Sequence, residues 1–404
     1  MRFLSALTLL PGVLAHTWIE QLRNVDDQGN YVGEYGYPRA FVSKTDPGYN
    51  GESMNWQLPQ NDAEGAPFIN ADTPLCHPEQ RKAAQSSENY PRLQATPGDF
   101  IAMRYMENGH ITDAAQLKGK PEKGGPIYVF ATTEPKEDEK LADVLRWTTD
   151  GQGGDKRGVL LTVNDFDDGR CYELKPGNPE SEKRKAAHPN YAAGQPANGP
   201  GTYPLFCETN VGIPKDVATG KPYTLYWVWQ WNTVGGADPI LPKGKDEYYT
   251  TCIDVDVVNT LAASETAQFG LAQQDGMDKA VPDFRQRKAL ITDPIGFEQG
   301  PVFRDDGNNG NGNGNATTTG TPSMPPQTTF ATSTGAPYGN STASLQIPTL
   351  TRPPGAPTGS PGDAITVTVT ERITITASVV TPTVAPPAKK RTVVTKLVGA
   401  KFRY

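Results

Sequence analysis

Most apolar residues of the chain come in short runs that are separated by glycine- and proline-containing turns. Five of these runs are rich in β-branched and aromatic residues: GDFIAMRYMENG, GPIYVFATT, GVLLTV, PYTLYWVWQWNT and EYYTTCIDVDVV. Runs of this length and composition are typical of strands that pack in a sheet. Short strands joined by long polar loops favour two antiparallel sheets packed face to face. We therefore predict an all-β fold, an immunoglobulin- or fibronectin-like antiparallel β-sandwich with long loops.

Helical patterns are few. The segment Lys140–Arg146 predicts one short helix, and Ser264–Gln273 predicts another with Ser264 as its N-cap. Residues 178–201, NPESEKRKAAHPNYAAGQPANGPG, are so polar and so interrupted by proline that we interpret them as a loop.

The two ends of the chain differ in composition from its middle. Arg2, the apolar run Phe3–Leu10 and the small residue Ala15 indicate a secretory signal peptide over residues 1–15. Residues 304–404 are rich in Gly, Asn, Thr, Ser and Pro, which predicts a low-complexity linker and basic tail that is disordered. The folded domain then covers residues 16–303, with a C-terminal extension from about residue 263.

The predicted tail carries two N-glycosylation sequons, at Asn315 and Asn340, and its Ser, Thr and Pro content favours O-glycosylation. One stretch in it, ITVTVTERITITASVV, alternates as a strand does, so a small binding module is an alternative for that part.

Charge and cysteine content exclude several classes of function. The net charge of −7 comes without a basic patch interleaved with aromatic residues, which argues against nucleic acid as a partner. After the signal, no stretch reaches the roughly 20 apolar residues of a membrane span. The four cysteines, Cys76, Cys171, Cys207 and Cys252, contain no CxxC pair, so two disulfides are expected, with three pairings open.

The residue after the predicted cleavage site is His16, one of only four histidines in the chain. A free N-terminal histidine offers a metal its α-amine and its imidazole, and a second imidazole would complete a planar set of three nitrogens that suits Cu(II). The candidates for that second ligand are His77, His110 and His188. We favour His110, because a strand-like run leads into it through the tight turn Asn108-Gly109. An ordinary half-buried residue at a strand end is the alternative for it.

An aromatic run and an acidic loop also bear on function. Alternation places five apolar side chains on one strand face, which indicates sandwich core rather than a sugar-stacking platform: Tyr223, Leu225, Trp227, Trp229 and Trp231. The acidic loop Val163–Gly169 lacks the ligand positions of an EF-hand, so we do not assign calcium to it.

Three elements together resemble the fungal lytic polysaccharide monooxygenases, which bind one copper ion through an N-terminal histidine brace. They are a signal ending directly before His16, the stretch from Pro97-Gly98-Asp99 to Asn108-Gly109-His110, and the late strand Tyr249-Thr250-Thr251-Cys252. The resemblance spans about His16 to Val258. The residues around His110 differ from the motifs of the best-known subfamilies, the chain has long insertions, and it lacks a recognisable carbohydrate-binding module. These features indicate a divergent branch of the family.

The resemblance implies roles for particular residues. His16 and His110 would be the copper ligands, Tyr249 would occupy the axial position, and Glu247 would stand where relatives place a residue that positions an oxygen species. It also implies the disulfides Cys76–Cys252 and Cys171–Cys207. For Tyr248 and Tyr249 the alternative is two aromatic residues on opposite strand faces, and for Glu247 it is a solvated edge charge.

The function implied by the resemblance is secreted, copper-dependent oxidative cleavage of polysaccharide glycosidic bonds by a monomer that takes electrons from an external donor. Two alternatives remain open. One is a secreted copper-binding protein with the same brace and no turnover, and the other is a structural cell-wall glycoprotein.

Overall fold

The computed structural model describes residues 16–60, 67–112, 118–173, 175–188, 205–261 and 277–304. The chain divides into two units, Met1–Asn315 and Ala316–Tyr404, and all described residues belong to the first. The predicted signal peptide, the helix predicted over Ser264–Gln273, both sequons and the strand-like stretch of the tail lie outside the described residues.

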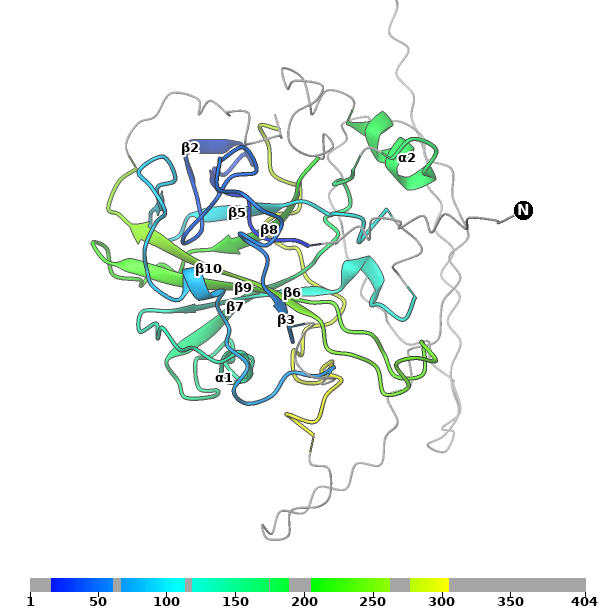
Figure 1. Ribbon diagram of the computed structural model, residues 1–404. Helices are drawn as coiled ribbons and strands as arrows, with labels where there is room; N and C mark the ends of the chain where they lie inside the picture. The colour runs from blue at the N-terminus through cyan, green and yellow to red at the C-terminus, as the bar shows by residue number, and fades with distance from the viewer. Residues whose placement is uncertain are drawn as a thin grey trace, which may run out of the picture. The chain divides into compact units, whose positions relative to one another are not determined.

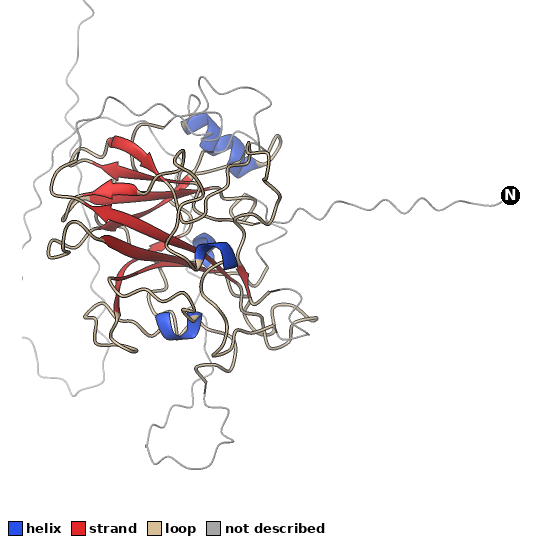
Figure 2. Ribbon diagram, turned by 60° about the vertical axis from the view of Figure 1, so that its left-hand side comes forward, coloured by secondary structure: helices blue, strands red, loops and turns tan. Residues whose placement is uncertain are grey.

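Two β-sheets form the first unit, as predicted, and they pack as layers with the short helices at the periphery (Figures 1 and 2). The smaller sheet has the order β2-β1-β5-β8, built from Tyr31–Gly36, Gln21–Val25, Phe100–Tyr105 and Cys207–Gly212. The larger has the order β3-β10-β9-β6-β7, built from Gln57–Leu58, Tyr248–Val257, Pro222–Gln230, Pro126–Thr132 and Gly158–Asp165. All of these neighbours are antiparallel, and β4 (Leu93–Ala95) adds one parallel pairing to β10.

The core between the sheets contains the aromatic face that the sequence predicted. Tyr223, Leu225, Trp227, Trp229 and Trp231 all belong to one buried cluster. Tyr249 and Ile253 of β10 lie in the same cluster, while Tyr248 and Cys252 point to the opposite face and join a second buried cluster under α1 (Leu141–Val144). β9 and β10 are therefore buried on both faces, because loops and α1 cover the outer side of the larger sheet.

One sequence prediction is wrong. Residues 178–201 were expected to form a loop, but Pro179–Ala187 form α2. The Asn178 side chain accepts a hydrogen bond from the Ser181 N–H at 2.9 Å and caps the helix, and Pro179 stands in its first turn. The Arg184 guanidinium is buried against the Asp167 carboxylate and the Cys171 carbonyl. These contacts stabilise a helix whose own sequence has no apolar face.

Two disulfides join distant parts of the fold, and their pairing is the one the resemblance implies. Cys76–Cys252 ties the loop after β3 to β10, and Cys171–Cys207 ties the segment after β7 to β8. Two short 3₁₀ helices complete the described elements, η1 (Pro78–Gln80) and η3 (Glu122–Gly124). Within the described ranges, none of the helices has the length and hydropathy needed to cross a bilayer.

Candidate functional site

The N-terminal segment and the end of β5 lie side by side. The Glu20 N–H donates to the Arg104 carbonyl at 2.8 Å, and the Thr17 hydroxyl donates to the Met106 carbonyl at 3.1 Å. At the start of this N-terminal segment, the Asn108 side-chain amide donates to the His16 carbonyl. His16 is thus fixed against the turn that carries His110.

The turn itself has the backbone that its sequence predicts. Asn108 and Gly109 adopt φ angles of +50° and +85°, and the His110 N–H donates to the Glu107 carbonyl at 2.9 Å. Asparagine and glycine are the residues that tolerate this left-handed region best. The turn directs the His110 side chain into the end of the sandwich, where it is 0% exposed and therefore fully rather than half buried.

The two nitrogens of His110 differ in their surroundings. Nδ1 lies 2.8 Å from the Glu107 carbonyl oxygen, and since a carbonyl only accepts, Nδ1 carries the proton. Nε2 then holds a lone pair, and it is buried with no hydrogen-bond partner among the described residues. Trp229 and Trp231 meet the ring edge-on at centroid distances of 4.6 and 4.3 Å.

His110 is a neutral imidazole at neutral pH. Burial lowers its pKa to about 4, and the positive charge of Lys120 and the nearness of His16 act in the same direction. A neutral imidazole is the form that binds metal ions.

The two nitrogens of His16 also differ in their surroundings. Nε2 lies 3.6 Å from a Glu52 carboxylate oxygen, whereas Nδ1 is buried and has no hydrogen-bond partner among the residues described. In metal sites, a ligating histidine directs its second nitrogen to a carboxylate or carbonyl, which fixes the ring. The chemistry of the two unpartnered nitrogens, His16 Nδ1 and His110 Nε2, is that of metal donors.

Tyr249 and Glu247 lie beside His110 and are joined to each other. The Tyr249 ring is 6.0 Å from the His110 ring and stacks on Trp229 at 4.8 Å, and its hydroxyl donates to Glu247 Oε1 at 2.8 Å. Burial and the adjacent Glu247 charge raise the pKa of Tyr249 well above its usual range, so the phenol stays protonated.

Glu247 is buried, which excludes a solvated edge charge. Burial by itself would raise the pKa of Glu247, but the charges of Lys120 and Lys245 outweigh it, so the net direction is down. Lys120 Nζ lies 2.7 Å from Glu247 Oε2, and Glu247 is therefore a carboxylate anion held by a lysine.

Sequence reasoning missed Lys120, Glu52 and the contact of Asn108 with His16. Lys120 and Glu247 are 127 residues apart, and no motif relates them. The glycine-rich turn around Asn108 was the only signal available, and it indicated backbone conformation rather than contact.

The other two histidines have structural surroundings. His77 Nδ1 accepts a hydrogen bond from the Glu79 N–H at 3.2 Å at the start of η1, and its ring meets Trp56 edge-on. His188 is the C-cap of α2.

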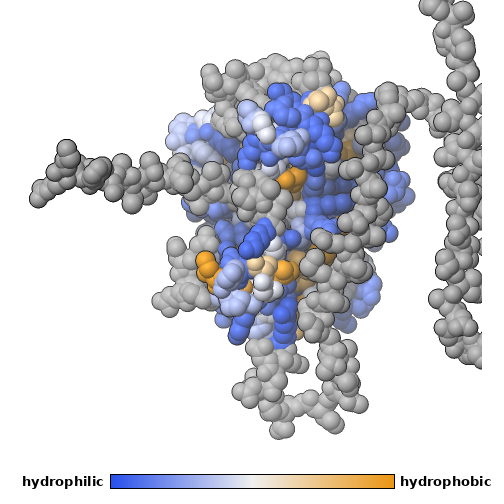
Figure 3. Space-filling view, turned by 90° about the vertical axis from the view of Figure 1, so that its right-hand side faces the viewer, coloured by the Kyte–Doolittle hydropathy of each residue, from blue (hydrophilic) through white to orange (hydrophobic). Residues whose placement is uncertain are grey.

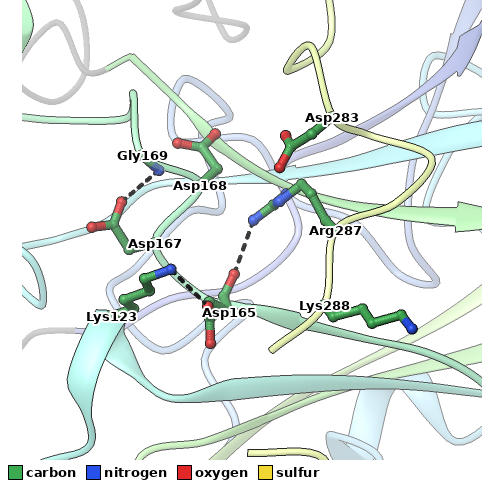
Figure 4. Close-up of a pocket in the computed structure, with 8 residues that line it drawn as sticks. All are labelled: Lys123, Asp165, Asp167, Asp168, Gly169, Asp283, Arg287 and Lys288. Atoms are coloured by element: carbon green, nitrogen blue, oxygen red, sulfur yellow. Dashed lines mark hydrogen bonds and ion pairs between the residues drawn. The ribbon is translucent and has the colours of Figure 1, made fainter. Parts of the chain in front are cut away.

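A hollow of about 150 Å³ lies at the end of β7, and neither His16 nor His110 lines it (Figure 4). Its carboxylates are matched by cations, as Lys123 lies 3.4 Å from Asp165 and Arg184 pairs with Asp167. Among the described residues, three side chains of metal-binding type lie close together here: Asp167, Asp168 and Cys171. The Cys171 sulfur, however, is in a disulfide. These contacts of the acidic loop are ion pairs within the fold.

The fold and these contacts define a two-sheet β-sandwich whose end holds two histidines with unpartnered ring nitrogens. Residues 13–282 match the model of a family described as "Domain of unknown function (DUF7492)", and the chain belongs to this family. No curated protein matches it.

Several solved structures show a distant likeness. A cellulose-active polysaccharide monooxygenase from M. thermophila is 17% identical, with 66% of this chain and 85% of that chain covered and a TM-score of 0.24. Cel61B of Hypocrea jecorina, a glycoside hydrolase family 61 member, is 13% identical, with 68% and 89% covered and a TM-score of 0.27. The polysaccharide monooxygenase CBM33 is 11% identical, with 51% and 82% covered and a TM-score of 0.22. These values are too low to transfer any function to this chain.

Proposed function

We propose that the protein is a secreted, copper-dependent monooxygenase that cleaves glycosidic bonds of a polysaccharide. The observation that carries the proposal is the pair of buried, unpartnered ring nitrogens, His16 Nδ1 and His110 Nε2. Each ring has its other nitrogen near a protein oxygen, from Glu52 and Glu107 respectively.

Removal of residues 1–15 would free the α-amine of His16, so that the amine, His16 Nδ1 and His110 Nε2 together hold one copper ion. Three nitrogen donors of this kind suit copper above other first-row metals. Bound copper supplies the one-electron chemistry with O₂ or H₂O₂ that oxidises a C–H bond of the sugar, with electrons from an external donor.

The surrounding residues of the chain bind, orient and shield. Asn108 holds the His16 backbone, Glu107 fixes the His110 tautomer, and Trp229 and Trp231 keep water from the His110 ring. Tyr249 would lie beside the ion, with its hydroxyl proton kept on oxygen by donation to Glu247.

The remaining parts of the proposal concern context. The protein would act outside the cell as a monomer on a biomass or cell-wall glycan, with cell-wall association as the alternative, and Asn315 and Asn340 would carry glycans. The proposed function includes neither a nucleic-acid partner nor a membrane span.

The test is a Cu(II) titration, followed by EPR, of protein secreted with its native N-terminus. We expect tight binding with a nitrogen-rich axial spectrum, and a loss of affinity of roughly a hundredfold or more in His110→Ala and in a variant with one alanine added before His16. His77→Ala is the matched control and keeps full affinity. Unchanged affinity in His110→Ala overturns the proposal.

Oxidised sugar products then distinguish the enzyme from a binding protein. Release of oxidised oligosaccharides from cellulose, chitin or xylan with ascorbate supports turnover. Tight copper binding without products from any glycan supports the binding-only alternative, and failure to bind copper leaves the cell-wall glycoprotein.

A further inference from the structure

Lys120 is a buried cation next to the candidate copper site. Its side chain is 8% exposed, and Nζ donates to Glu247 Oε2 at 2.7 Å and to the Trp231 carbonyl at 2.8 Å. The same ammonium lies 3.9 Å from the centre of the Trp231 ring. Two hydrogen bonds and a cation–π contact fix this lysine in one position.

Lys120 determines which oxygen of the Glu247 carboxylate is left to accept the Tyr249 hydroxyl. Oε2 is taken by Lys120, and Oε1 accepts the Tyr249 hydroxyl. With the carboxylate held at one oxygen, the other stays in place to receive the phenol, so the direction of the Tyr249 O–H follows from Lys120. Lys245, the other cation near Oε2 at 3.5 Å, lies on the more exposed side.

Two routes of contact lead from Lys120 to His110. One runs through Glu247 and Tyr249, and the other through Trp231, whose ring is 4.3 Å from the His110 ring. A buried ion pair adds little net stability over an apolar pair of the same size, so what it supplies here is position.

We propose that Lys120 is a positioning residue of the candidate copper site: it holds Glu247 and Trp231 in place and thereby sets how Tyr249 and His110 meet a bound ion. This inference rests on the proposed function. It names a residue that contacts neither histidine and that no spacing in the sequence indicates.

The test compares Lys120→Met, which removes the charge at similar length, with Lys120→Arg, which keeps it. Lys123→Met, at an exposed lysine of the neighbouring turn, is the matched control. We expect Lys120→Met to bind copper but with an altered EPR spectrum and a turnover lower by about 10- to 100-fold, the range for groups that orient ligands. Lys120→Arg restores the spectrum at least in part, and Lys123→Met matches the wild type.

A wild-type EPR spectrum and turnover in Lys120→Met overturn the proposal. Where that variant does not fold, the double variant Lys120→Met/Glu247→Gln removes both charges and leaves no buried ion unpaired. The proposal requires the double variant to show the altered spectrum, and an unaltered spectrum overturns it.

A wild-type protein that binds no copper overturns the proposed function alone. The metal-free protein then tests Lys120 through the near-ultraviolet circular dichroism of the tryptophan and tyrosine side chains. A changed spectrum in Lys120→Met that Lys120→Arg restores supports a positioning role, and an unchanged spectrum overturns it.

Discussion

Asp246 and Glu247 are consecutive buried carboxyl groups whose pKa values move in opposite directions. Glu247 faces the sandwich interior, where Lys120 holds it as an anion and lowers its pKa. Burial raises the pKa of Asp246, although hydrogen bonds from the Glu298 side chain and from backbone N–H groups act against it. The difference teaches that burial raises the pKa of both groups and that the lysines near Glu247 reverse this direction.

The Asp246 side of this pair anchors the last described segment of the chain. The Asp246 carboxylate accepts from the Gln299 N–H at 2.9 Å and the Ile69 N–H at 3.0 Å, and Glu298 accepts from the Gly300 N–H. Burial, with the Asp246 hydrogen bond and charge, raises the pKa of Glu298 to about 9, although Arg304 acts against it. One proton shared by two carboxyls thus holds residues 298–300 against the start of β10.

The largest loss of stability from a single substitution is expected at Glu247. Glu247→Ala leaves the Lys120 ammonium buried without its main counter-charge, which should lower the free energy of unfolding by about 3 to 5 kcal/mol. Urea denaturation at pH 7 measures this loss. A loss below about 1 kcal/mol would show that the pair behaves as a surface salt bridge does.

A smaller loss of stability is expected when a methyl group is added next to Asp246 and Glu298. In Gly300→Ala the new Cβ would lie 2.6 Å from Glu298 Oε1 and 2.8 Å from Asp246 Oδ2. Overpacking of this kind costs about 1 to 3 kcal/mol. The melting temperature should fall relative to Gly48→Ala, whose Cβ meets nothing within 4 Å. Equal melting temperatures would mean that the segment shifts freely.

The effect that is smallest at any single pH step is a dependence on pH, which is spread over several pH units. Because the folded-state pKa of Glu298, about 9, lies above its ordinary value, the folded protein binds more protons between the two. Its contribution to stability is complete below the ordinary carboxyl pKa and is lost as the pH rises towards 9, by at most about 1.4 kcal/mol per pH unit. Glu298→Gln should flatten this decline in denaturation curves taken from pH 5 to 9, and parallel declines in both proteins would contradict the shared proton.

Sequence patterns predicted correctly the strands whose signal lies entirely within their own residues. The strands around Phe100–Tyr105, Pro222–Gln230 and Tyr248–Val257 lie where β-branched and aromatic runs predicted them, because side-chain alternation is a local property. The short helix at Leu141–Val144 was predicted for the same reason. The helix Pro179–Ala187 was missed, although Asn178 and Pro179 are local start signals, because it has no apolar face and its Arg184 pairs with the distant Asp167.

The candidate site divides in the same way. His16 and His110 were proposed from their types and places in the sequence, and Tyr249 and Glu247 from the family resemblance. Whether they bind copper stays a prediction. Lys120 and Glu52 could not be found, because each acts on a residue that is distant in the sequence.

By itself the sequence determined the class of fold, the aromatic inner face of β9 and the tight turn before His110, since each follows from local spacing and backbone preference. Only the tertiary structure decided which nitrogen of each histidine has no partner, and which of two adjacent carboxyls meets a lysine and which meets another acid. The physical reason is that protonation and lone-pair direction depend on groups brought close by packing, and packing joins residues that no local pattern relates.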